Sequence, residues 1–455
     1  MSQAPFMLGI SGCRGIVGET MTPHVAARLA ACWGERLAAE HDEPVVCLGR
    51  DSRPSGAELS QAAAAGLVAT GCRVVDLGIV ATPTLGVVIG SLQAAGGVLI
   101  TASHNPGEWN GMKLLDHRGT APPASLAGSI VERYHAGGPK GVDPSARVDV
   151  DTESRANDTH VAKVLGRIDP RRVMHAAPRV LLDSVRGAGG PAGSALLNLI
   201  GCDLVHLEAE PDGDFPRLPE PTAANLAEVG PRVVKAGAMV GFVQDPDADR
   251  LAMLDAEGRY IGEEYTLALA AWSVLRDRPG GNAVANLSTS RMIDHVAERF
   301  GATVHRAAVG EANVAETMRN INADIGGEGN GGVILPEVTW VRDSLSAMLL
   351  VLDLAVAEGA TIADLVDALP RYAMLKRTLP LADRTAIEPA LAALKSAFPH
   401  DRLDDSNGVR IDFEEGWVHV RPSNTEPIAR IIAEAKDEAS ATAIADRVAA
   451  AAGLS

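Results

Sequence analysis

Short apolar runs alternate along most of the chain with longer stretches in which apolar residues recur every third or fourth position. The short runs predict buried strands, and the longer stretches predict amphipathic helices. Near the N-terminus, strands are predicted at Val45–Leu48 and Gly97–Thr101, and an Ala-rich helix is predicted from Gly56 to Thr70 between them. Such alternation of strand and helix is typical of an α/β sheet that helices cover on both faces.

The same alternation recurs in two further blocks, and the last block differs from them. Strands predicted at Val180–Asp183 and Ala283–Leu287 belong to the second and third blocks. The last block is predicted to form a strand, a helix, a pair of strands and a final helix, which is an α+β arrangement. We therefore predict three similar α/β domains and a smaller α+β domain, at residues 1–150, 151–255, 256–368 and 369–455.

Length and composition narrow the classes of protein. With 455 residues the chain is too long for one hydrophobic core, because such cores stop growing at about 250–300 residues. The net charge of −17 argues against a nucleic-acid-binding surface. No apolar run approaches the roughly 20 residues that cross a bilayer and no signal peptide is visible, so we expect a cytoplasmic protein without a membrane partner. The five cysteines lack metal-binding spacing and are predicted to be reduced thiols, with Cys13 a buried one.

One segment, Ile100–Pro106, places a hydroxyl at the end of a buried strand. The strand delivers Ser103 into a loop that also holds His104, and a second strand at Met112–Leu115 carries the chain away. A serine hydrolase needs a general base, but His104 is the next residue, and adjacent side chains normally point apart. We therefore interpret Ser103 as a phosphoryl carrier. His104 is interpreted either as a helper that hydrogen-bonds the phosphoserine or as a structural residue of the loop.

Three aspartates, Asp245, Asp247 and Asp249, alternate directly after another apolar strand. Alternation would place their carboxylates on one side, and a bent loop would wrap them around a cation. A solvated acidic turn is the alternative, but the neighbouring strand is apolar and the loop ends in Arg250. Oxygen ligands without histidine or cysteine favour Mg²⁺ over zinc, and a phosphate oxygen on Ser103 would complete the coordination.

Three further segments have the composition of binding loops. Glu328 and Asn330 stand among glycines, where the backbone would approach a ligand while a carboxylate and an amide meet sugar hydroxyls; a flexible hairpin is the alternative. Arg421–Thr425 offers a guanidinium, two hydroxyls and an amide for an anion, with a simple Asx or Ser turn as the alternative. The Gly-rich segment Gly9–Gly18, which contains Arg14, is predicted as a loop that approaches a ligand or as a flexible turn.

Together these segments resemble the α-D-phosphohexomutase superfamily along the whole chain. Four motifs carry the resemblance, in the order in which the family has them: Thr101–Pro106, Asp245–Arg250, Gly327–Gly331 and Arg421–Pro427. Ser11–Gly15 is also similar to the family's opening loop, with a cysteine where many members have an aliphatic residue. Four motifs with one in each predicted domain make the match specific. The resemblance implies a heart-shaped molecule, in which three similar domains with mixed sheets and a smaller fourth domain surround a central cleft.

The resemblance also implies a reaction of the isomerase class. Phosphorylated Ser103 would give its phosphoryl group to a hexose monophosphate, the bisphosphate would turn over in the cleft, and the other phosphate would return to Ser103. Hexose 1,6-bisphosphate would be the activator. One Mg²⁺ per chain would be held by Ser103, Asp245, Asp247 and Asp249, with Arg250 beside it. The other residues that the resemblance places near the transferring group are His104, Arg14 and Lys113, the last as a candidate proton carrier.

The non-reacting phosphate and the sugar are assigned to the other two loops. The resemblance gives the phosphate to Arg421, Ser423, Asn424, Thr425 and Arg430. It gives the sugar to Glu328, Asn330 and Arg342. Many bacterial members have a serine where Asn330 stands and a histidine where Gly332 stands, whereas this version with Arg342–Asp343 is similar to phosphoglucosamine mutases of the archaeal type. Arg306, His305 or Arg342 would replace the absent histidine.

The expected reaction is therefore the conversion of glucosamine 6-phosphate to glucosamine 1-phosphate. A phosphomannomutase or phosphoglucomutase is the nearest alternative. A non-catalytic sugar-phosphate-binding protein is a different class, and the presence of Ser103 with all three aspartates argues against it. A metal-dependent phosphatase is a third. A phosphosugar is the expected partner, and the sequence leaves both a monomer and a homodimer open.

Overall fold

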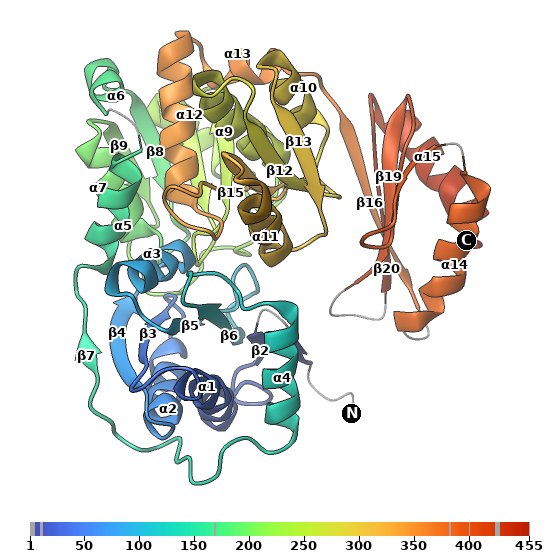
Figure 1. The fold of residues 1–455 in the computed structure, drawn as a ribbon. Helices are drawn as coiled ribbons and strands as arrows, with labels where there is room; N and C mark the ends of the chain where they lie inside the picture. Colours follow the sequence, from blue (N-terminus) through green and yellow to red (C-terminus); the bar gives the residue numbers. More distant parts are fainter. Residues whose placement is uncertain are drawn as a thin grey trace.

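The computed structural model describes residues 5–9, 12–167, 170–381, 384–399, 401–423 and 428–454. Four sheets with their helices form four domains that follow one another along the chain, as the sequence predicts (Figure 1). Domains I to III make up the larger part of the molecule, and domain IV stands beside domain III (Figure 1).

Domain I is built on a mixed sheet in which the strands lie in the order β1-β2-β6-β5-β3-β4-β7. β3 pairs in parallel with β4 and β5, and β6 pairs antiparallel with β5 and β2. Its strands are β1 (Phe6–Gly9), β2 (Gly12–Ile16), β3 (Val45–Arg50), β4 (Arg73–Ile79), β5 (Gly96–Ile100), β6 (Trp109–Asp116) and β7 (Asp151–Thr152). Its helices are α1 (Pro23–Ala38), α2 (Gly56–Val68), α3 (Thr82–Leu92) and α4 (Ala124–His135).

The prediction of a loop at Gly9–Gly18 is wrong over Gly12–Ile16, which forms strand β2. This strand lies between β1 and β6 and pairs antiparallel with both. Glycine permits the close pairing, because a Cβ on Gly12 would lie 1.8 Å from the carbonyl oxygen of Met112. The strand carries Arg14 to the side of the serine loop, where its Nη1 donates a 2.7 Å hydrogen bond to Asn105 Oδ1.

Domains II and III share one sheet plan, with three parallel strands and one antiparallel edge strand each. Domain II has β8 (Arg179–Asp183), β9 (Asp203–Leu207), β10 (Val240–Gln244), β11 (Leu251–Asp255), α5 (Ala156–Leu165), α6 (Arg171–Ala176), α7 (Gly190–Leu199) and α8 (Gly230–Ala236). Domain III has β12 (Asn282–Asn286), β13 (Thr303–Ala307), β14 (Ile325–Glu328), β15 (Gly332–Ile334), α9 (Glu263–Asp277), α10 (Met292–Arg299), α11 (Glu311–Ile321), α12 (Ser344–Glu358) and α13 (Ile362–Asp367).

Domain IV has a sheet whose pairings in the described residues are all antiparallel, in the order β16-β20-β19-β18-β17. The strands are β16 (Ala373–Pro380), β17 (Arg402–Asp404), β18 (Val409–Asp412), β19 (Gly416–Pro422) and β20 (Ile428–Ala435). The helical segments are η1 (Arg384–Ile387), α14 (Glu388–Ala397) and α15 (Glu438–Ala451), and the two α-helices lie together on one side of the sheet in Figure 1.

The hydrophobic cores do not follow the domains one by one. A single cluster of buried side chains runs through domains II and III and includes Val87 of domain I, whereas domain IV has a core of its own. A hydrogen-bonded line also crosses the first three domains: His160 Nδ1 lies 2.9 Å from Thr84 Oγ1, and its Nε2 lies 3.3 Å from Asp343 Oδ2. Domains I to III are thus joined through their interiors.

The cysteines agree with the prediction of reduced thiols, and the helices that the structure describes agree with a protein without membrane spans. All five cysteines are buried and free. Burial raises the pKa of the Cys13 thiol to about 12, so this residue is an inert thiol and not a nucleophile. Among the residues that the structure describes, no helix combines the length and the apolar character that crossing a bilayer requires.

Candidate active site

Each domain contributes one candidate loop, and each loop joins two neighbouring antiparallel strands. The serine loop joins β5 to β6, and the aspartate loop joins β10 to β11. The Glu328 loop joins β14 to β15, and the segment after Arg421, which itself lies at the end of β19, leads to β20. The sequence indicated four separate loops, and in the structure all four connect the strands of an antiparallel pair.

Ser103 sits in the serine loop with a left-handed backbone, at φ +51°, and is 1% exposed. Its Oγ donates to Asp245 Oδ2 at 3.2 Å, so the serine of domain I touches the aspartate loop of domain II. The same Oγ lies 3.3 Å from His104 Nδ1. Adjacent side chains therefore do meet here, contrary to the expectation from an extended chain, because the left-handed turn brings them to one side.

The protonation state of His104 follows from its surroundings. Burial lowers the pKa of this imidazole to about 3, and the positive charges of Arg250 and Arg14 act in the same direction. His104 is therefore neutral at physiological pH, and its Nδ1 lies within hydrogen-bonding distance of the serine hydroxyl.

A buried ion pair that the sequence analysis missed holds the serine loop from behind. Arg53 and Asp51 are both 0% exposed and form an ion pair with each other. Arg53 Nη2 donates to the backbone carbonyls of Ser103, at 2.9 Å, and of Asn105. Thr101 Oγ1 donates to Asp51 Oδ2 at 2.6 Å and accepts the Ser103 N–H at 2.9 Å. The signal was a polar segment directly after the buried strand β3.

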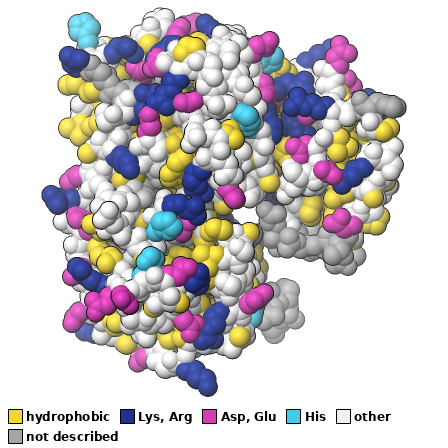
Figure 2. Space-filling model, viewed as in Figure 1, with side chains coloured by type: hydrophobic (Ala, Val, Ile, Leu, Met, Phe, Trp, Pro, Cys, Tyr) yellow, Lys and Arg dark blue, Asp and Glu magenta, His cyan; other side chains and the backbone are white. Residues whose placement is uncertain are grey.

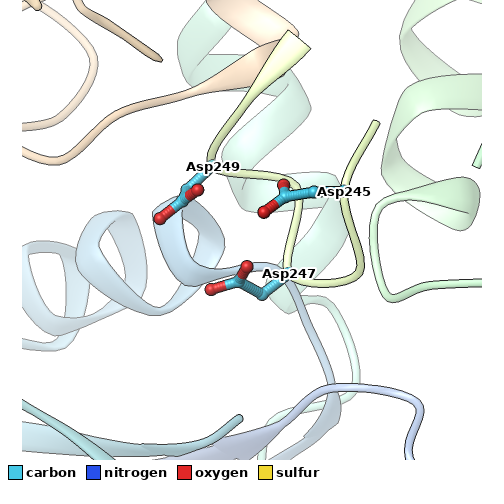
Figure 3. A group of neighbouring side chains, drawn as sticks. All are labelled: Asp245, Asp247 and Asp249. Carbon is cyan, nitrogen blue, oxygen red and sulfur yellow. The ribbon is translucent and has the colours of Figure 1, made fainter. Parts of the chain in front are cut away.

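The aspartate loop brings three carboxylates together. Asp245, Asp247 and Asp249 are 0% exposed, each offers an oxygen within 4.8 Å of the others, and Figure 3 shows the carboxylates turned toward a common space. Ala248 adopts a left-handed backbone, at φ +52°, which bends the loop around this space. The prediction that the alternating aspartates gather in a bent loop is therefore correct.

The side chains of Lys113 and Thr82 bind the Oδ2 atoms of the aspartate loop. Lys113 Nζ donates to Asp247 Oδ2 at 2.6 Å and to Asp249 Oδ2 at 2.9 Å. Thr82, the first residue of α3, donates its hydroxyl to Asp247 Oδ2 at 2.5 Å and its N–H to the Asp247 carbonyl at 2.9 Å. Sequence reasoning missed Thr82, and its position between a strand end and a Pro-initiated helix was the available signal.

The pKa values reflect this crowding. Burial raises the pKa of Asp245 well above its ordinary value, and the charges of Asp249 and Asp247 raise it further. Burial also raises the pKa of Asp249, but the positive charges of Arg342 and Lys113 outweigh it and hold that pKa well below its usual range. For Lys113, burial lowers the pKa, and the two aspartates beside it overcome that effect and raise it. Lys113 therefore keeps its proton in this arrangement.

The three carboxylates fit a divalent cation. Oδ1 of Asp247 and Oδ1 of Asp249 are buried and have no hydrogen-bond partner among the described residues. A buried carboxylate oxygen without a partner is costly, and a cation bound between the side chains would satisfy both oxygens. Oxygen-only ligands of this kind are typical of Mg²⁺ sites.

The Glu328 hairpin is closely tied to the rest of domain III. Glu328 Oε1 accepts the amide of Asn286 at 2.8 Å and the N–H of Gly310 at 3.1 Å. Glu328 Oε2 accepts Arg342 Nη1 at 2.6 Å. Asn330 has a buried Oδ1 without a hydrogen-bond partner in the described part of the chain, so it is available to a ligand donor.

Two arginines of domain IV lie directly opposite each other on adjacent strands. Arg421 of β19 is the cross-strand partner of Arg430 of β20. Burial and, to a smaller extent, the charge of Arg430 lower the pKa of Arg421 to about 10. Like charges in this position are unfavourable unless an anion lies between them. Figure 2 shows Lys and Arg side chains on the part of domain IV that faces domain III.

The other predicted phosphate ligands are only partly described. Ser423 is 2% exposed, and its N–H donates to the Ile428 carbonyl at 2.9 Å. Asn424 and Thr425 lie outside the residues that the structure describes. Of the candidates for the place of the absent histidine, Arg342 is the one packed against Gly332, while Arg306 pairs with Asp294 and His305 contacts Asn282.

Family models match the chain over nearly its whole length. Those for the α/β/α domains I, II and III of phosphoglucomutase/phosphomannomutase match residues 6–140, 158–258 and 262–372, and the C-terminal domain model matches residues 356–451. The chain belongs to the phosphoglucomutase/phosphomannomutase family.

Individual members of this family are similar over almost full length. The chain is 37% identical over 438 residues to the "Phosphoglucomutase/phosphomannomutase" of Thermococcus kodakarensis, covering 95% of each chain. It is 34% identical over 440 residues to the "Probable phosphoglucosamine mutase" of Methanopyrus kandleri, covering 96% of each. The crystal structure of a phosphoglucomutase/phosphomannomutase family protein from Burkholderia thailandensis superposes with a TM-score of 0.83, at 26% identity, over 98% of this chain and 97% of that one. The predicted superfamily and four-domain fold are thereby confirmed.

Proposed function

We propose that this protein is a phosphohexomutase that interconverts hexose 6-phosphates and hexose 1-phosphates through a phosphoserine at Ser103. The observation that carries the proposal is the contact between Ser103 Oγ and Asp245 Oδ2 at 3.2 Å, at the edge of the buried carboxylate triad. A serine hydroxyl beside three carboxylates is poorly placed for acyl chemistry, because the neighbouring His104, with its pKa lowered to about 3, is a weak base and an oxyanion would meet negative charge. A phosphoryl group bridging a serine and a cation fits the same residues.

The chain's own residues perform the positioning that phosphoryl transfer requires. Ser103 gives its phosphoryl group to the free hydroxyl of a hexose monophosphate and later receives the other phosphate of the bisphosphate. Arg14 and the neutral His104 lie around Ser103 and orient the transferring group. Asp245, Asp247 and Asp249 would hold one Mg²⁺, which when bound supplies positive charge to the phosphoryl oxygens. Arg250 closes the aspartate loop, and its N–H fixes Asp245 Oδ1 at 3.1 Å.

A transfer in two directions needs a second anion site, and domain IV supplies it. Arg421 and Arg430 lie opposite each other and would hold the phosphate that is not reacting, together with Ser423, Asn424 and Thr425. Glu328, Asn330 and Arg342 form the sugar side of the site. A hexose 1,6-bisphosphate would activate the enzyme by phosphorylating Ser103.

We propose glucosamine phosphate as the preferred substrate. The Glu328–Gly332 segment supports this choice through its similarity to archaeal phosphoglucosamine mutases, and the relative from Methanopyrus kandleri carries that name. The relative from Thermococcus kodakarensis is named for glucose and mannose phosphates, which makes these sugars the second candidate.

The substrate panel tests the proposal. The protein is incubated with Mg²⁺, a trace of hexose 1,6-bisphosphate, and the 6-phosphate of glucosamine, glucose or mannose in separate reactions. We expect the 1-phosphate to form in each active reaction, with the largest kcat/KM for glucosamine. Absence of interconversion for every sugar would refute the mutase. Steady release of phosphate in excess of isomerisation would indicate a phosphatase.

The carrier role of Ser103 has a separate test. Ser103→Ala removes the acceptor oxygen, so we expect turnover to be abolished while the dissociation constant of the sugar phosphate stays measurable. Intact-mass analysis of the wild-type protein after treatment with the bisphosphate should show a phosphoryl increment that maps to Ser103. Full activity of the alanine variant would rule out the carrier role.

A further inference from the structure

One arginine, Arg342, joins the aspartate loop to the Glu328 hairpin. Its Nη2 donates to Asp249 Oδ2 at 2.7 Å, and its Nη1 donates to Glu328 Oε2 at 2.6 Å. Its Nε lies 3.0 Å from Glu311 Oε2, and its backbone N–H donates to the same oxygen, also at 3.0 Å. Arg342 is only 9% exposed, so these charge interactions are little screened by water.

The backbone around Arg342 is fixed from both sides. The N–H of Asp343 donates to the Val333 carbonyl of β15 at 2.7 Å, and the Asp343 side chain caps α12. Gln244 Nε2, at the end of β10, donates to Ser344 Oγ at 2.9 Å. The aspartate loop and the hairpin also meet directly, through a 2.9 Å hydrogen bond from Leu251 N to the Gly331 carbonyl. The backbone next to Arg342 is therefore fixed both by the Glu328 hairpin and by the segment that leads into the aspartate loop.

Gly332 leaves the space through which the Arg342 side chain passes. A Cβ on Gly332 would lie 2.1 Å from Arg342 Cδ, a distance that no pair of non-bonded carbons tolerates. Gly332 is not among the glycines with positive φ, so the requirement for glycine here is one of space. The arginine occupies the volume that a side chain at position 332 would fill.

Arg342 forms ion pairs with more than one acidic side chain. One guanidinium faces three carboxylates, those of Asp249, Glu328 and Glu311. Asp249 also belongs to the triad that fits a divalent cation. A cation in that triad and Arg342 would therefore both bind the carboxylate of Asp249. Arg342 also binds the carboxylate of Glu328, which belongs to the hairpin.

We propose that Arg342 is a positioning residue that couples the cation site to the sugar site, so that occupation of one changes the affinity of the other. The inference rests on the function proposed above and adds to the place of Arg342 on the sugar side of the site a role in positioning Glu328. With a cation bound in the triad, Asp249 would have less negative charge to offer Arg342, and the guanidinium would be held mainly by Glu328 and Glu311. Glu328 becomes better ordered for the sugar hydroxyls, so a cation tightens sugar-phosphate binding and the sugar phosphate tightens cation binding by the same factor.

Calorimetry measures this coupling without turnover. The full-length protein is used with Ser103 unphosphorylated, as intact mass verifies, so that no phosphoryl group is available for transfer. The dissociation constant of glucosamine 6-phosphate is measured with and without saturating Mg²⁺, and that of Mg²⁺ with and without the sugar phosphate. Glucose 6-phosphate replaces glucosamine 6-phosphate if the wild type binds it more tightly. We expect a coupling factor of about tenfold, within the range typical of coupled sites.

Two variants remove the bridge in different ways. Arg342→Gln removes the positive charge of the guanidinium. Arg342→Lys keeps a positive charge but lacks the planar guanidinium that reaches two carboxylates at once. We expect the coupling factor to fall below about twofold in both. Gly332→Ala should displace the arginine and give the same loss, and the double variant Gly332→Ala/Arg342→Gln should be no worse than Arg342→Gln, because both changes remove one interaction.

Two controls separate the bridge from other effects. In the first control, inorganic phosphate replaces the sugar phosphate, because its coupling to Mg²⁺ is a direct charge effect that does not involve the hairpin. The coupling factor between inorganic phosphate and Mg²⁺ should be the same in the Arg342 variants as in the wild type. Arg278→Gln removes another arginine of domain III that pairs with two carboxylates, Asp324 and Glu337, away from the site. Its coupling factor should equal that of the wild type.

The outcomes discriminate clearly. Loss of coupling for the sugar phosphate alone supports the proposal. Retention of the wild-type factor in Arg342→Gln overturns it, and retention in Arg342→Lys shows that charge is enough and overturns the bridge. A wild type that binds the sugar phosphate without any coupling to Mg²⁺ also overturns it, while leaving the mutase intact. A wild type that binds no sugar phosphate refutes the proposed function itself.

Discussion

The backbone of Ser103 is strained, and its neighbours are arranged to hold it. A left-handed conformation costs a residue with a side chain about 1–2 kcal/mol, and Ser103 adopts it at φ +51°. The Arg53 guanidinium opposes this cost by binding the carbonyl oxygens on both sides of the turn. Without that support the loop would relax, and the hydroxyl would leave the aspartates of domain II.

Arg53→Lys tests this support. The lysine keeps the charge beside Asp51 but offers a single point of contact, so we expect kcat to fall about 100-fold, as small misplacements of reacting groups do. The dissociation constants of Mg²⁺ and sugar phosphate should stay within about twofold of the wild type, because Arg53 touches neither site. Steady-state kinetics and calorimetry measure these quantities.

Arg73→Lys is the matched control, since Arg73 is an exposed arginine of the same domain with one surface ion pair. Its kcat should be unchanged. An Arg53→Lys enzyme with wild-type kcat would contradict the positioning role, and an equal loss in both variants would point to general instability.

The residues that carry chemistry were easier to predict than those that hold them. Ser103 and the three aspartates stand in short motifs, and their residue types indicate the chemistry directly. Arg53 and Thr82 act through contacts with residues distant in sequence, at 50 positions for Arg53 and Ser103 and at 165 for Thr82 and Asp247. The first pair depends on the pairing of β3 with β5 inside domain I, and the second depends on the packing of domain I against domain II; neither is readable from a local sequence pattern.

At the scale of elements, the chain repeats one arrangement, an antiparallel strand pair with the proposed site residues in or beside its connecting loop. Helices were predictable where their apolar periodicity is local; α2, for example, begins at the predicted Gly56 and ends at Val68, close to the predicted Thr70. Strand β2 was missed because its glycines indicate a loop, whereas they are present for close pairing with β6. Sequence composition describes a glycine's freedom but not the neighbour that requires it.

The start of helix α3 is the element that fixes the aspartate loop from domain I. Thr82→Val keeps the shape of the side chain but removes the hydroxyl that donates to Asp247 Oδ2. Partners of metal ligands typically contribute 10–100-fold in metal affinity, and we expect a loss of about tenfold in Mg²⁺ affinity by calorimetry.

The control for this change is Thr70→Val. Thr70 lies just after α2, and its hydroxyl contacts the helix carbonyls of Leu67 and Gly66 and the thiol of Cys72, all within domain I. This variant should bind Mg²⁺ as the wild type does. Equal affinity in Thr82→Val and the wild type would show that the hydroxyl does not orient Asp247.

At the scale of the whole molecule, a partly buried carboxyl, that of Glu264, lies where domain III meets domain IV. Glu264 Oε2 accepts the N–H of Ser290 at 3.0 Å, and Gly329 leaves the space next to it. Burial raises the pKa of Glu264 from its ordinary value of 4.5 to about 8, although the charge of Lys376 in domain IV opposes this. The folded protein therefore keeps this carboxyl protonated well above the pH at which the unfolded chain ionises it.

The consequence is a pH dependence of stability with a defined sign. As the pH rises from about 4.5 to about 8, the unfolded chain loses the proton first, so the folded state loses stability by up to about 1.4 kcal/mol per pH unit from this group. Glu264→Gln should remove that part of the slope. Thermal melting across this pH range measures it, with the exposed Glu316→Gln as control. An unchanged slope in Glu264→Gln would contradict the raised pKa.

The hydrogen-bonded line from Thr84 through His160 to Asp343 has a consequence for how this gene can be recombined. Exchange of any one of the first three domains with that of a relative would separate one member of the line from the other two and would cut the core shared by domains II and III. Domain IV has its own core, so it is the segment that a chimera can replace with the least disturbance of the interior. Natural or engineered variation in the segment that follows Arg421 is therefore easier to obtain by exchange than variation in the other three loops.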